Sequence, residues 1–374
     1  MKKTLTANIS GTVFHIEEDA YEQLSRYLNT IRGQFASTDG RDEIMADIEA
    51  RIAELFFYVY GYDYIHEFVY YPEKLEHLIE TQELVSVGAV LPDGRLVGHV
   101  GLRRWNADPL VYEPCLGVVD PVLKSRGVFS RVFNETMKVA DQISMSYLFF
   151  DFVTNHEFSQ KFVSRYNPID LALLVGCQSK ATQAKLERLG MGADPKDTDR
   201  YSLLYSVLPR AEFPFGRDVE LPMNLGEEIG FLLEPLGISW YPASRFSVLP
   251  DGGEYKSSLQ PAQNAVLFDL VCPGRRAVEK ILAEWQQYLR NGYEYVAVDV
   301  LVGSPGVGNL YDLLQEAGFF VAGFLPYHHG NRLAIRFQAM GPSKVAFDEI
   351  KVHSPIANRL LDLIQIQYER TQTL

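Results

Sequence analysis

The stretch from residue 116 to residue 133 reads Leu-Gly-Val-Val-Asp-Pro-Val-Leu-Lys-Ser-Arg-Gly-Val-Phe-Ser-Arg-Val-Phe. It predicts an apolar strand that ends at Asp120 and Pro121, a short cationic loop, and a helix with apolar residues at helical spacing. A helix entered through a glycine loop presents backbone N–H groups and the positive end of its dipole at one place. The stretch therefore predicts an anion site, with a phosphate or pyrophosphate as the expected ligand.

The loop of this stretch resembles the coenzyme A loop of the GNAT family of N-acetyltransferases, which carries Gln/Arg-x-x-Gly-x-Gly/Ala. The cation, the glycine at the fourth position and the preceding strand match, whereas a phenylalanine stands where the family has a small residue. The resemblance implies acetyl-CoA as co-substrate, with the pantetheine arm held by the backbone of Val118 and Val119. It assigns the phosphates to Lys124, Ser125, Arg126, Gly127, Val128 and Phe129.

The composition limits the classes of protein to which the chain could belong. The chain has 374 residues, enough for more than one domain, and a formal net charge of −13, which argues against nucleic acid or an anionic membrane as partner. Its three cysteines lie far apart in apolar runs, which is typical of reduced thiols in a cytoplasmic protein. We expect no signal peptide and no membrane span, because no long uninterrupted apolar run is present.

The elements around the loop follow the order of a GNAT fold. Strands are predicted at 84–90 and 96–102 with a turn between them, and further strands at 147–153 and 169–176. The resemblance places the helix beside the cofactor arm after the first of these later strands, and it assigns Asn155 and Ser159 to cofactor binding. Asn155 or Thr154 is expected to cap this helix.

A more specific resemblance begins at residue 57. The strings Tyr-Gly-Tyr-Asp-Tyr at 60–64, Tyr-Tyr-Pro-Glu at 70–73 and His-Glu-Phe-Ser-Gln-Lys at 156–161 are similar to the acetyltransferase half of fused anti-sigma-kinase/acetyltransferase proteins. The kinase half is absent here. The aromatic run at 56–64 is open to two interpretations, a wall of a ligand cleft or a packed entry to the domain.

The remainder of the chain is predicted to be a degenerate copy of the same unit, with a helix over 222–236 and a strand near 245–249 among its elements. Residues 298–302 and 313–319 parallel the strand at 149–153 and the helix after it, while Pro-Gly-Arg-Arg at 273–276 lacks the glycine pattern of an anion loop. The expected fold class is α/β, with tandem GNAT-like mixed sheets flanked by helices. The expected domains are a small unit at 1–52, a GNAT-like domain at 53–210 and a degenerate GNAT-like domain at 211–374.

The N-terminal unit is predicted to be a hairpin followed by two helices. Apolar residues alternate at Leu5, Ala7 and Ile9 before a Ser-Gly turn, and helical patterns run over 18–32 and from residue 41. This region resembles the leader found ahead of phage-shock-protein-C domains. We interpret it as an interaction module, through which a protein partner could bind.

The candidate base for acetyl transfer is Glu113, on the strand that leads to the loop, where the family often has a carboxylate. Its alternative is an exposed glutamate at a strand end. The tyrosine acid of the family has no counterpart, because the matching position is Val163 and Tyr166 is out of register. His99 is expected to be a satisfied core residue, and no metal site is predicted.

Two functions from different classes follow. The first is N-acetyltransferase activity, which transfers an acetyl group from acetyl-CoA to a small-molecule or protein amine. The second is a non-catalytic acyl-CoA-binding module with a regulatory or protein-interaction role, favoured by Phe129 and by the missing acid. A third, purely structural interpretation predicts no binding of coenzyme A at all.

Overall fold

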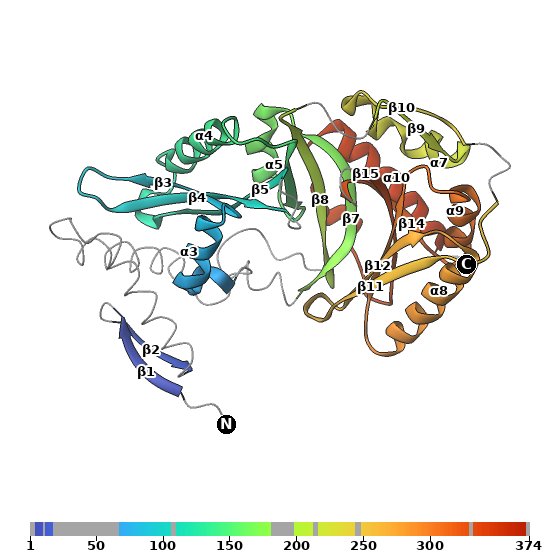
Figure 1. Cartoon of the computed structure of the whole chain (residues 1–374), viewed down its shortest axis with the longest axis horizontal. Helices are drawn as coiled ribbons and strands as arrows, with labels where there is room; N and C mark the ends of the chain where they lie inside the picture. The colour runs from blue at the N-terminus through green and yellow to red at the C-terminus, as the bar shows by residue number, and fades with distance from the viewer. Residues whose placement is uncertain are drawn as a thin grey trace. The chain divides into compact units, whose positions relative to one another are not determined.

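The structure is a computed structural model of the whole chain, and it describes residues 4–9, 12–17, 67–105, 110–180, 198–211, 216–243, 248–328 and 332–371. Within these residues no helix is long and apolar enough to span a bilayer. The chain divides into two compact units, Met1–Ser144 and Met145–Leu374 (Figure 1). The strands between 147 and 209 join a sheet with later strands, and the domains expected at 1–52, 53–210 and 211–374 stay predictions.

The N-terminal hairpin is present as predicted. Strand β1 (Thr4–Ile9) pairs antiparallel with β2 (Thr12–Glu17), and Ile9 lies opposite Thr12, which leaves a connection of two residues. The helices predicted over 18–32 and from 41, and the aromatic run at 56–64, lie outside the described residues. The small N-terminal unit therefore stays a prediction.

Unit 1 contains an antiparallel meander of three strands, β3 (Leu84–Val90), β4 (Leu96–Arg104) and β5 (Val111–Val119). A short helical turn η1 (Glu67–Tyr70) and helix α3 (Pro72–Glu80) precede it. Helix α4 (Val128–Ala140) follows β5 and buries its apolar face. A Cβ atom added to Gly98 of β4 would lie 2.9 Å from Val128, so this glycine is what lets the start of α4 approach the sheet.

Eight of the strands described in unit 2 form a sheet in the order β11-β12-β13-β15-β14-β7-β8-β6. Its first half comprises β6 (Tyr147–Val153), α5 (Phe158–Val163), β7 (Ile169–Ser179) and β8 (Arg200–Pro209). Its second half comprises β11 (Glu254–Gln260), β12 (Ala265–Cys272), α8 (Arg275–Arg290), β13 (Tyr295–Leu301), α9 (Val307–Glu316), β14 (Phe320–His328), β15 (Arg332–Met340) and α10 (Pro355–Thr371).

The two halves of unit 2 repeat one pattern. In each, a strand and a helix are followed by two strands, and the last strand inserts next to the first, which gives the orders β6-β8-β7 and β13-β15-β14. The halves join where Gly323 of β14 lies opposite Ala172 of β7. A Cβ atom on Gly323 would stand 2.1 Å from the Leu171 carbonyl oxygen, so the two strands meet at a residue that has to be glycine.

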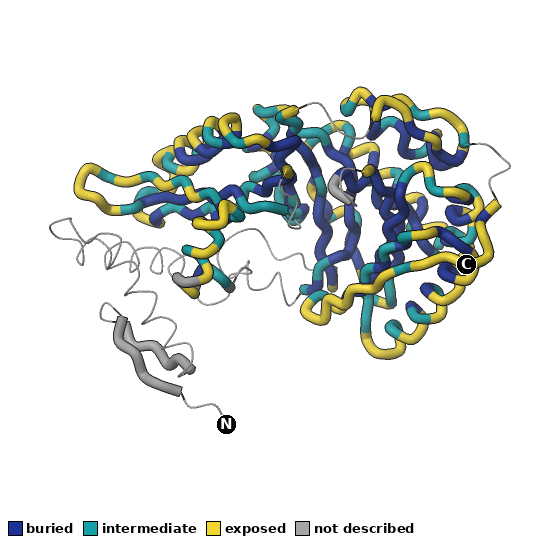
Figure 2. The backbone as a smooth tube through the Cα atoms, viewed as in Figure 1, coloured by how far each residue is buried: buried dark blue, intermediate teal, exposed yellow. Residues whose placement is uncertain are grey.

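The centre of this sheet is the core of unit 2. Strand β13 is buried along its whole length. The edge strand β11 is exposed, as Figure 2 shows. The central strands read as continuous apolar runs, which is typical of strands covered on both faces. One ion pair lies in this interior, where Arg336 contacts both carboxylate oxygens of Asp299 at 2.7 Å. Its two-bond geometry compensates the cost of burying both charges.

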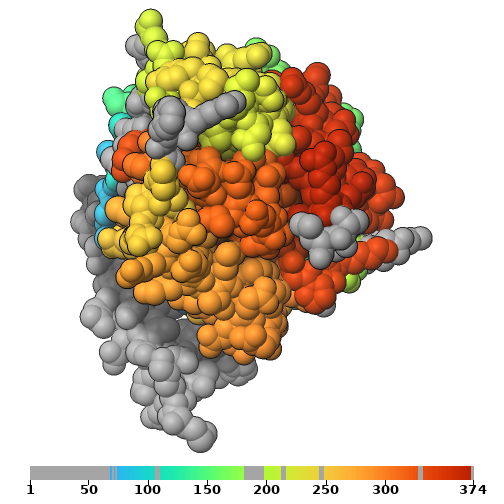
Figure 3. Space-filling model, turned by 90° about the vertical axis from the view of Figure 1, so that its right-hand side faces the viewer, coloured from blue at the N-terminus to red at the C-terminus, as the bar shows by residue number. Residues whose placement is uncertain are grey.

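Two predicted elements of unit 2 differ in the structure. The helix expected over 222–236 is α7 (Met223–Ile229) followed by two short 3-10 turns, and it lies between the parallel strands β9 (Asp218–Leu221) and β10 (Ser239–Pro242). This yellow-green segment lies beside the orange α9 (Figure 3). The strand expected near 245–249 is not formed at residues 248–249, because Leu249 packs against Gly306 instead of joining the sheet.

Candidate functional site

The turn between β5 and α4 has the geometry that the sequence predicts. Asp120 accepts a hydrogen bond from the Val122 N–H (3.0 Å), which shapes the first part of the loop. Gly127 is the N-cap of α4 in the left-handed conformation, with φ of +76°, and no side chain caps the first turn of the helix. A Cβ atom on Gly127 would meet nothing within 4 Å. The start of α4 therefore faces open space at the glycine, which suits an anion held by backbone N–H groups.

The residues assigned to coenzyme A by resemblance lie together in this part of unit 1. Val118 and Val119 end β5 opposite His99 and Gly98 of β4. The loop residues from Lys124 to Gly127 are all exposed. Ser125 adopts a φ of +67°, which is uncommon for a residue with a side chain. The structure thus brings the predicted loop residues to one exposed turn, and their roles in binding stay predictions.

A bulge in β5 bends the strand just before this turn. Leu116 and Gly117 together lie opposite the single residue Val100, and Leu116 has a φ of +53°. The Leu116 carbonyl oxygen accepts a hydrogen bond from Nδ1 of His99 at 3.0 Å, and Nε2 of His99 bonds the Ser86 hydroxyl. Since a carbonyl can only accept, Nδ1 carries the proton. The prediction that His99 is a satisfied core residue is confirmed, and its contact with the bulge was not anticipated.

This arrangement makes stability depend on pH. Burial lowers the pKa of His99, and the hydrogen bond to the Leu116 carbonyl raises it in part. A histidine whose folded pKa lies below its unfolded value stabilises the fold fully above the unfolded pKa of about 6.5, and that contribution is lost as the pH falls below it. We expect the urea midpoint of the wild type to fall between pH 7.5 and 5.5 by more than that of His99→Gln.

The control for this pH prediction is His77→Gln, at an exposed position of α3. Its midpoint should follow that of the wild type across the same pH range. An identical pH dependence in His99→Gln and the wild type would show that folding does not change the pKa of His99.

Phe129 fills a space on β5. A Cβ atom on Gly117 would lie 2.9 Å from the Phe129 ring, and the ring centroid is 5.9 Å from that of Phe133. The side chain remains 37% exposed. Gly117 therefore makes room for the ring. In the sequence, this packing is indicated by a glycine in the strand together with a phenylalanine at the second residue of the helix.

Glu113, the candidate base, is buried, so the alternative of an exposed strand-end glutamate is wrong. It lies opposite Arg103 of β4, and the two side chains form an ion pair with an N–O distance of 2.8 Å. The guanidinium neutralises the carboxylate charge at the site. The role of Glu113 as a base stays a prediction.

The other predicted binding residues lie in unit 2, between β6 and α5. Both polar atoms of the Asn155 amide are buried without a hydrogen-bond partner, and so is Nδ1 of His156. Burial lowers the pKa of His156. An unsatisfied buried polar group costs about 1–3 kcal/mol, so these groups are suited to a ligand that supplies the missing bonds. Ser159 is half-buried in the first turn of α5.

The predicted cap of α5 is wrong. The N-cap residue is Glu157, and no side chain caps the helix. The Thr154 hydroxyl instead donates to the Ser202 carbonyl oxygen at 2.9 Å, because that buried carbonyl of β8 needs a donor. Thr154 is therefore fixed to the sheet, and the Asn155 amide is left without a partner.

In the second half of unit 2, another segment of the chain covers the starts of α8 and α9. The first three N–H groups of α8, at residues 275–277, donate to the carbonyl oxygens of residues 250–252 at 2.7, 3.0 and 3.2 Å. A Cβ atom on Gly274 would stand 2.3 Å from the Gly252 oxygen, and one on Gly306 would stand 2.5 Å from Leu249. The segment 249–253, which we call the internal strap, therefore occupies the starts of α8 and α9.

The segment 273–276 lacks the glycine pattern of an anion loop. The internal strap is a second feature against anion binding there, and the sequence did not reveal it. Backbone carbonyls of the strap satisfy the N–H groups that an anion would need. Among the described residues, no group of three or more His, Cys, Asp or Glu side chains is placed to hold a metal ion.

No protein-family model and no curated protein matches the chain. The chain is similar to the solved structure of an aminoglycoside 6'-acetyltransferase type Ii, with 16% identity and a TM-score of 0.31, over 44% of this chain and 90% of that one. It is also similar to a GNAT superfamily phosphinothricin acetyltransferase from Sinorhizobium meliloti in complex with AcCoA, with 12% identity and a TM-score of 0.33, over 43% and 84%.

An N-acetyltransferase from Staphylococcus aureus Mu50 gives 11% identity and a TM-score of 0.34, over 45% of this chain and 94% of that one. These similar structures are acetyltransferases. Identities this low concern the fold alone, and at these TM-scores the likeness carries no argument about function.

Proposed function

We propose that the protein is an N-acetyltransferase that transfers an acetyl group from acetyl-CoA to an amine. The observation that supports this most is the turn at Gly127, where a left-handed glycine opens the uncapped start of α4 directly after a bulged strand. This arrangement suits a diphosphate, because backbone N–H groups and the helix dipole favour anions there.

In this proposal each assigned residue has one role. The N–H groups of residues 118 and 119 hold the pantetheine arm, and the loop residues 124–129 hold the diphosphate, with Lys124 and Arg126 as its cations. Asn155 and Ser159, both in unit 2, are assigned to acyl-CoA by the resemblance alone. Glu113 removes the proton of the attacking amine, either directly or through water.

We infer further that the chain contains two GNAT-like domains in tandem, at 53–210 and 211–374. Only the first of these domains binds acetyl-CoA. The repeated strand order of unit 2 supports the tandem interpretation. The internal strap supports the restriction to one site, because its carbonyls take the first three N–H groups of α8. The acceptor amine, the cytoplasmic location and a protein partner for residues 1–52 remain part of the proposal.

The second candidate, a non-catalytic acyl-CoA-binding module, is favoured by the Glu113–Arg103 ion pair. A carboxylate paired with a guanidinium at 2.8 Å is a weaker proton acceptor than a free one. Such a module would bind coenzyme A at the same turn without releasing a thiol in the presence of amines.

Calorimetry and a thiol-release assay test these alternatives. We expect titration of coenzyme A into the full chain to give one molecule per chain, and acetyl-CoA with a panel of amines to release free thiol. Binding without turnover for any amine would leave the second candidate. No binding would defeat both, and two molecules per chain would contradict the inference that the strap closes the second half.

A further inference from the structure

The segment 351–354, between β15 and α10, lies against the turn that connects β6 to α5. The Lys351 N–H donates to the Thr154 carbonyl oxygen at 2.6 Å. This contact joins residues almost two hundred positions apart, and both belong to unit 2. The turn that carries Asn155 and His156 is therefore braced by the C-terminal part of the chain.

Gln160 of α5 is the centre of this contact. Its side-chain nitrogen donates to the Lys351 carbonyl oxygen at 2.9 Å and to the Val153 carbonyl oxygen at 3.2 Å, with a longer contact of 3.4 Å to that of His156. Its side-chain oxygen accepts from the His353 N–H at 2.9 Å. One buried amide thus holds both ends of the turn 153–156 and the segment 351–354.

The far end of the segment is fixed to the sheet and to α10. The Ser354 hydroxyl donates to a carboxylate oxygen of Asp170 in β7 and accepts from the Ala357 N–H at 3.0 Å, so it also caps α10. The second carboxylate oxygen of Asp170 accepts from the Ser206 hydroxyl. The segment is therefore held at three successive points, by Thr154, Gln160 and Asp170.

We propose that Gln160 is a positioning residue, which uses the segment 351–354 to set the main chain of the turn 153–157 and thereby the Asn155 amide for acyl-CoA. The proposal rests on the proposed function for the identity of the ligand. It depends on the buried, unpartnered atoms of Asn155 and His156. Both residues lie in the turn before α5, and no side chain caps that helix. It also gives the second half of unit 2 a role, because residues of that half support a turn in the first half.

The test compares Gln160→Met with Gln367→Met in the full chain. Both glutamines are buried with 4% exposure, and Gln367 also makes main-chain and side-chain bonds, to Val321 N–H and Glu228. Hydrogen exchange without ligand should rise at least tenfold in Gln160→Met, both over 150–163 and over 349–358. The dissociation constant for coenzyme A should rise at least tenfold. Gln367→Met should leave both quantities within twofold of the wild type.

A second variant, Gln160→Glu, keeps the acceptor for the His353 N–H and puts a carboxylate oxygen against the carbonyl oxygens that the amide nitrogen contacts, so it should change both quantities in the same direction. Unchanged exchange over 349–358 in both Gln160 variants would overturn the brace. Raised exchange with an unchanged dissociation constant would overturn the positioning role. If the wild type itself binds no coenzyme A, the proposed function fails, and the positioning role fails with it, whereas the exchange data still decide whether the brace exists.

Discussion

Replacing Gly127 with asparagine is expected to remove most of the affinity for coenzyme A while the fold stays intact. Gly127 has a φ of +76°, and asparagine is the residue other than glycine that best tolerates this conformation. A Cβ atom at this position meets nothing within 4 Å, so the free protein has room for the side chain. The same room is where the proposed diphosphate lies, and an asparagine side chain would fill it.

Gly127→Asn is expected to change stability little and to weaken the binding of coenzyme A strongly. The free energy of unfolding should change by less than about 1 kcal/mol, because the left-handed conformation is retained. The loss of one or two charge-assisted hydrogen bonds to a phosphate costs about 2 kcal/mol or more, and a difference of 1.4 kcal/mol is tenfold in affinity. Calorimetry should therefore show a dissociation constant raised by at least about 30-fold.

Gly292→Asn is the matched control. Gly292 follows α8 with a φ of +84°, and a Cβ atom there also meets nothing within 4 Å. It shares the conformation and the open surroundings of Gly127 without a proposed ligand. Equal affinity losses in the two variants, or unchanged binding in Gly127→Asn, would place the diphosphate elsewhere.

Much of the fold of this chain is predictable from local pattern. The predicted strands 84–90 and 147–153 have the same bounds in β3 and β6, because each is an apolar run that ends at turn-forming residues. The turn around Gly127 is also predictable, since a glycine followed by apolar residues at helical spacing marks the start of a helix. These features depend on neighbouring residues only.

The features that the sequence leaves undetected depend on main-chain contacts between distant segments. The internal strap meets the start of α8 through backbone carbonyls, which any residue type provides. The bulge at Leu116 depends on His99 from another strand, and the bracing of the turn 153–156 depends on Gln160 and residues near 351. A single sequence does not pair such positions, because neither partner carries a pattern that identifies the other.

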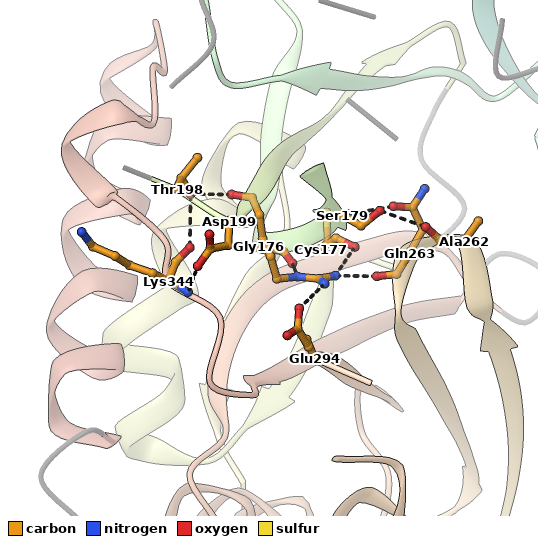
Figure 4. A network of polar contacts seen from close by, with 10 residues as sticks. Gly176, Cys177, Ser179, Thr198, Asp199, Ala262, Gln263, Glu294 and Lys344 are labelled. Atoms are coloured by element: carbon orange, nitrogen blue, oxygen red, sulfur yellow. Dashed lines mark hydrogen bonds and ion pairs between the residues drawn. The ribbon is translucent and has the colours of Figure 1, made fainter. Parts of the chain in front are cut away.

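Removal of the Arg200 side chain from unit 2 is expected to cause a large loss of stability. Arg200 begins β8, is 1% exposed, and donates to the carbonyl oxygens of Gly176 (2.5 Å), Gln263 (2.7 Å) and Cys177 (3.4 Å). These three partners are labelled in Figure 4. Arg200 also pairs with Glu294 at 3.4 Å. Burial lowers the pKa of Arg200, and nearby negative groups partly restore it.

The partners explain why a charged residue is needed at this place. Residues 175–177 bulge out of β7 opposite the single residue 202, which turns the carbonyls of Gly176 and Cys177 out of the ladder. The guanidinium satisfies them and joins the bulge to the turn between β11 and β12. No neutral side chain offers as many donors in one plane.

Arg200→Met should lower the free energy of unfolding by about 3–5 kcal/mol, because it leaves buried carbonyls and the Glu294 carboxylate without their donor. Urea denaturation followed by tryptophan fluorescence measures this loss. The control is Arg276→Met, whose pair with Asp251 spans 3.9 Å between side chains that are 74% and 82% exposed, and it should change stability by no more than about 0.5 kcal/mol. A loss below about 1 kcal/mol for Arg200→Met would mean that water reaches the bulge and replaces the guanidinium. In that case the junction between the two halves of unit 2 would depend on its other contacts, such as the approach of Gly323 to Ala172 and the bonds of Gln160 to residues 351 and 353.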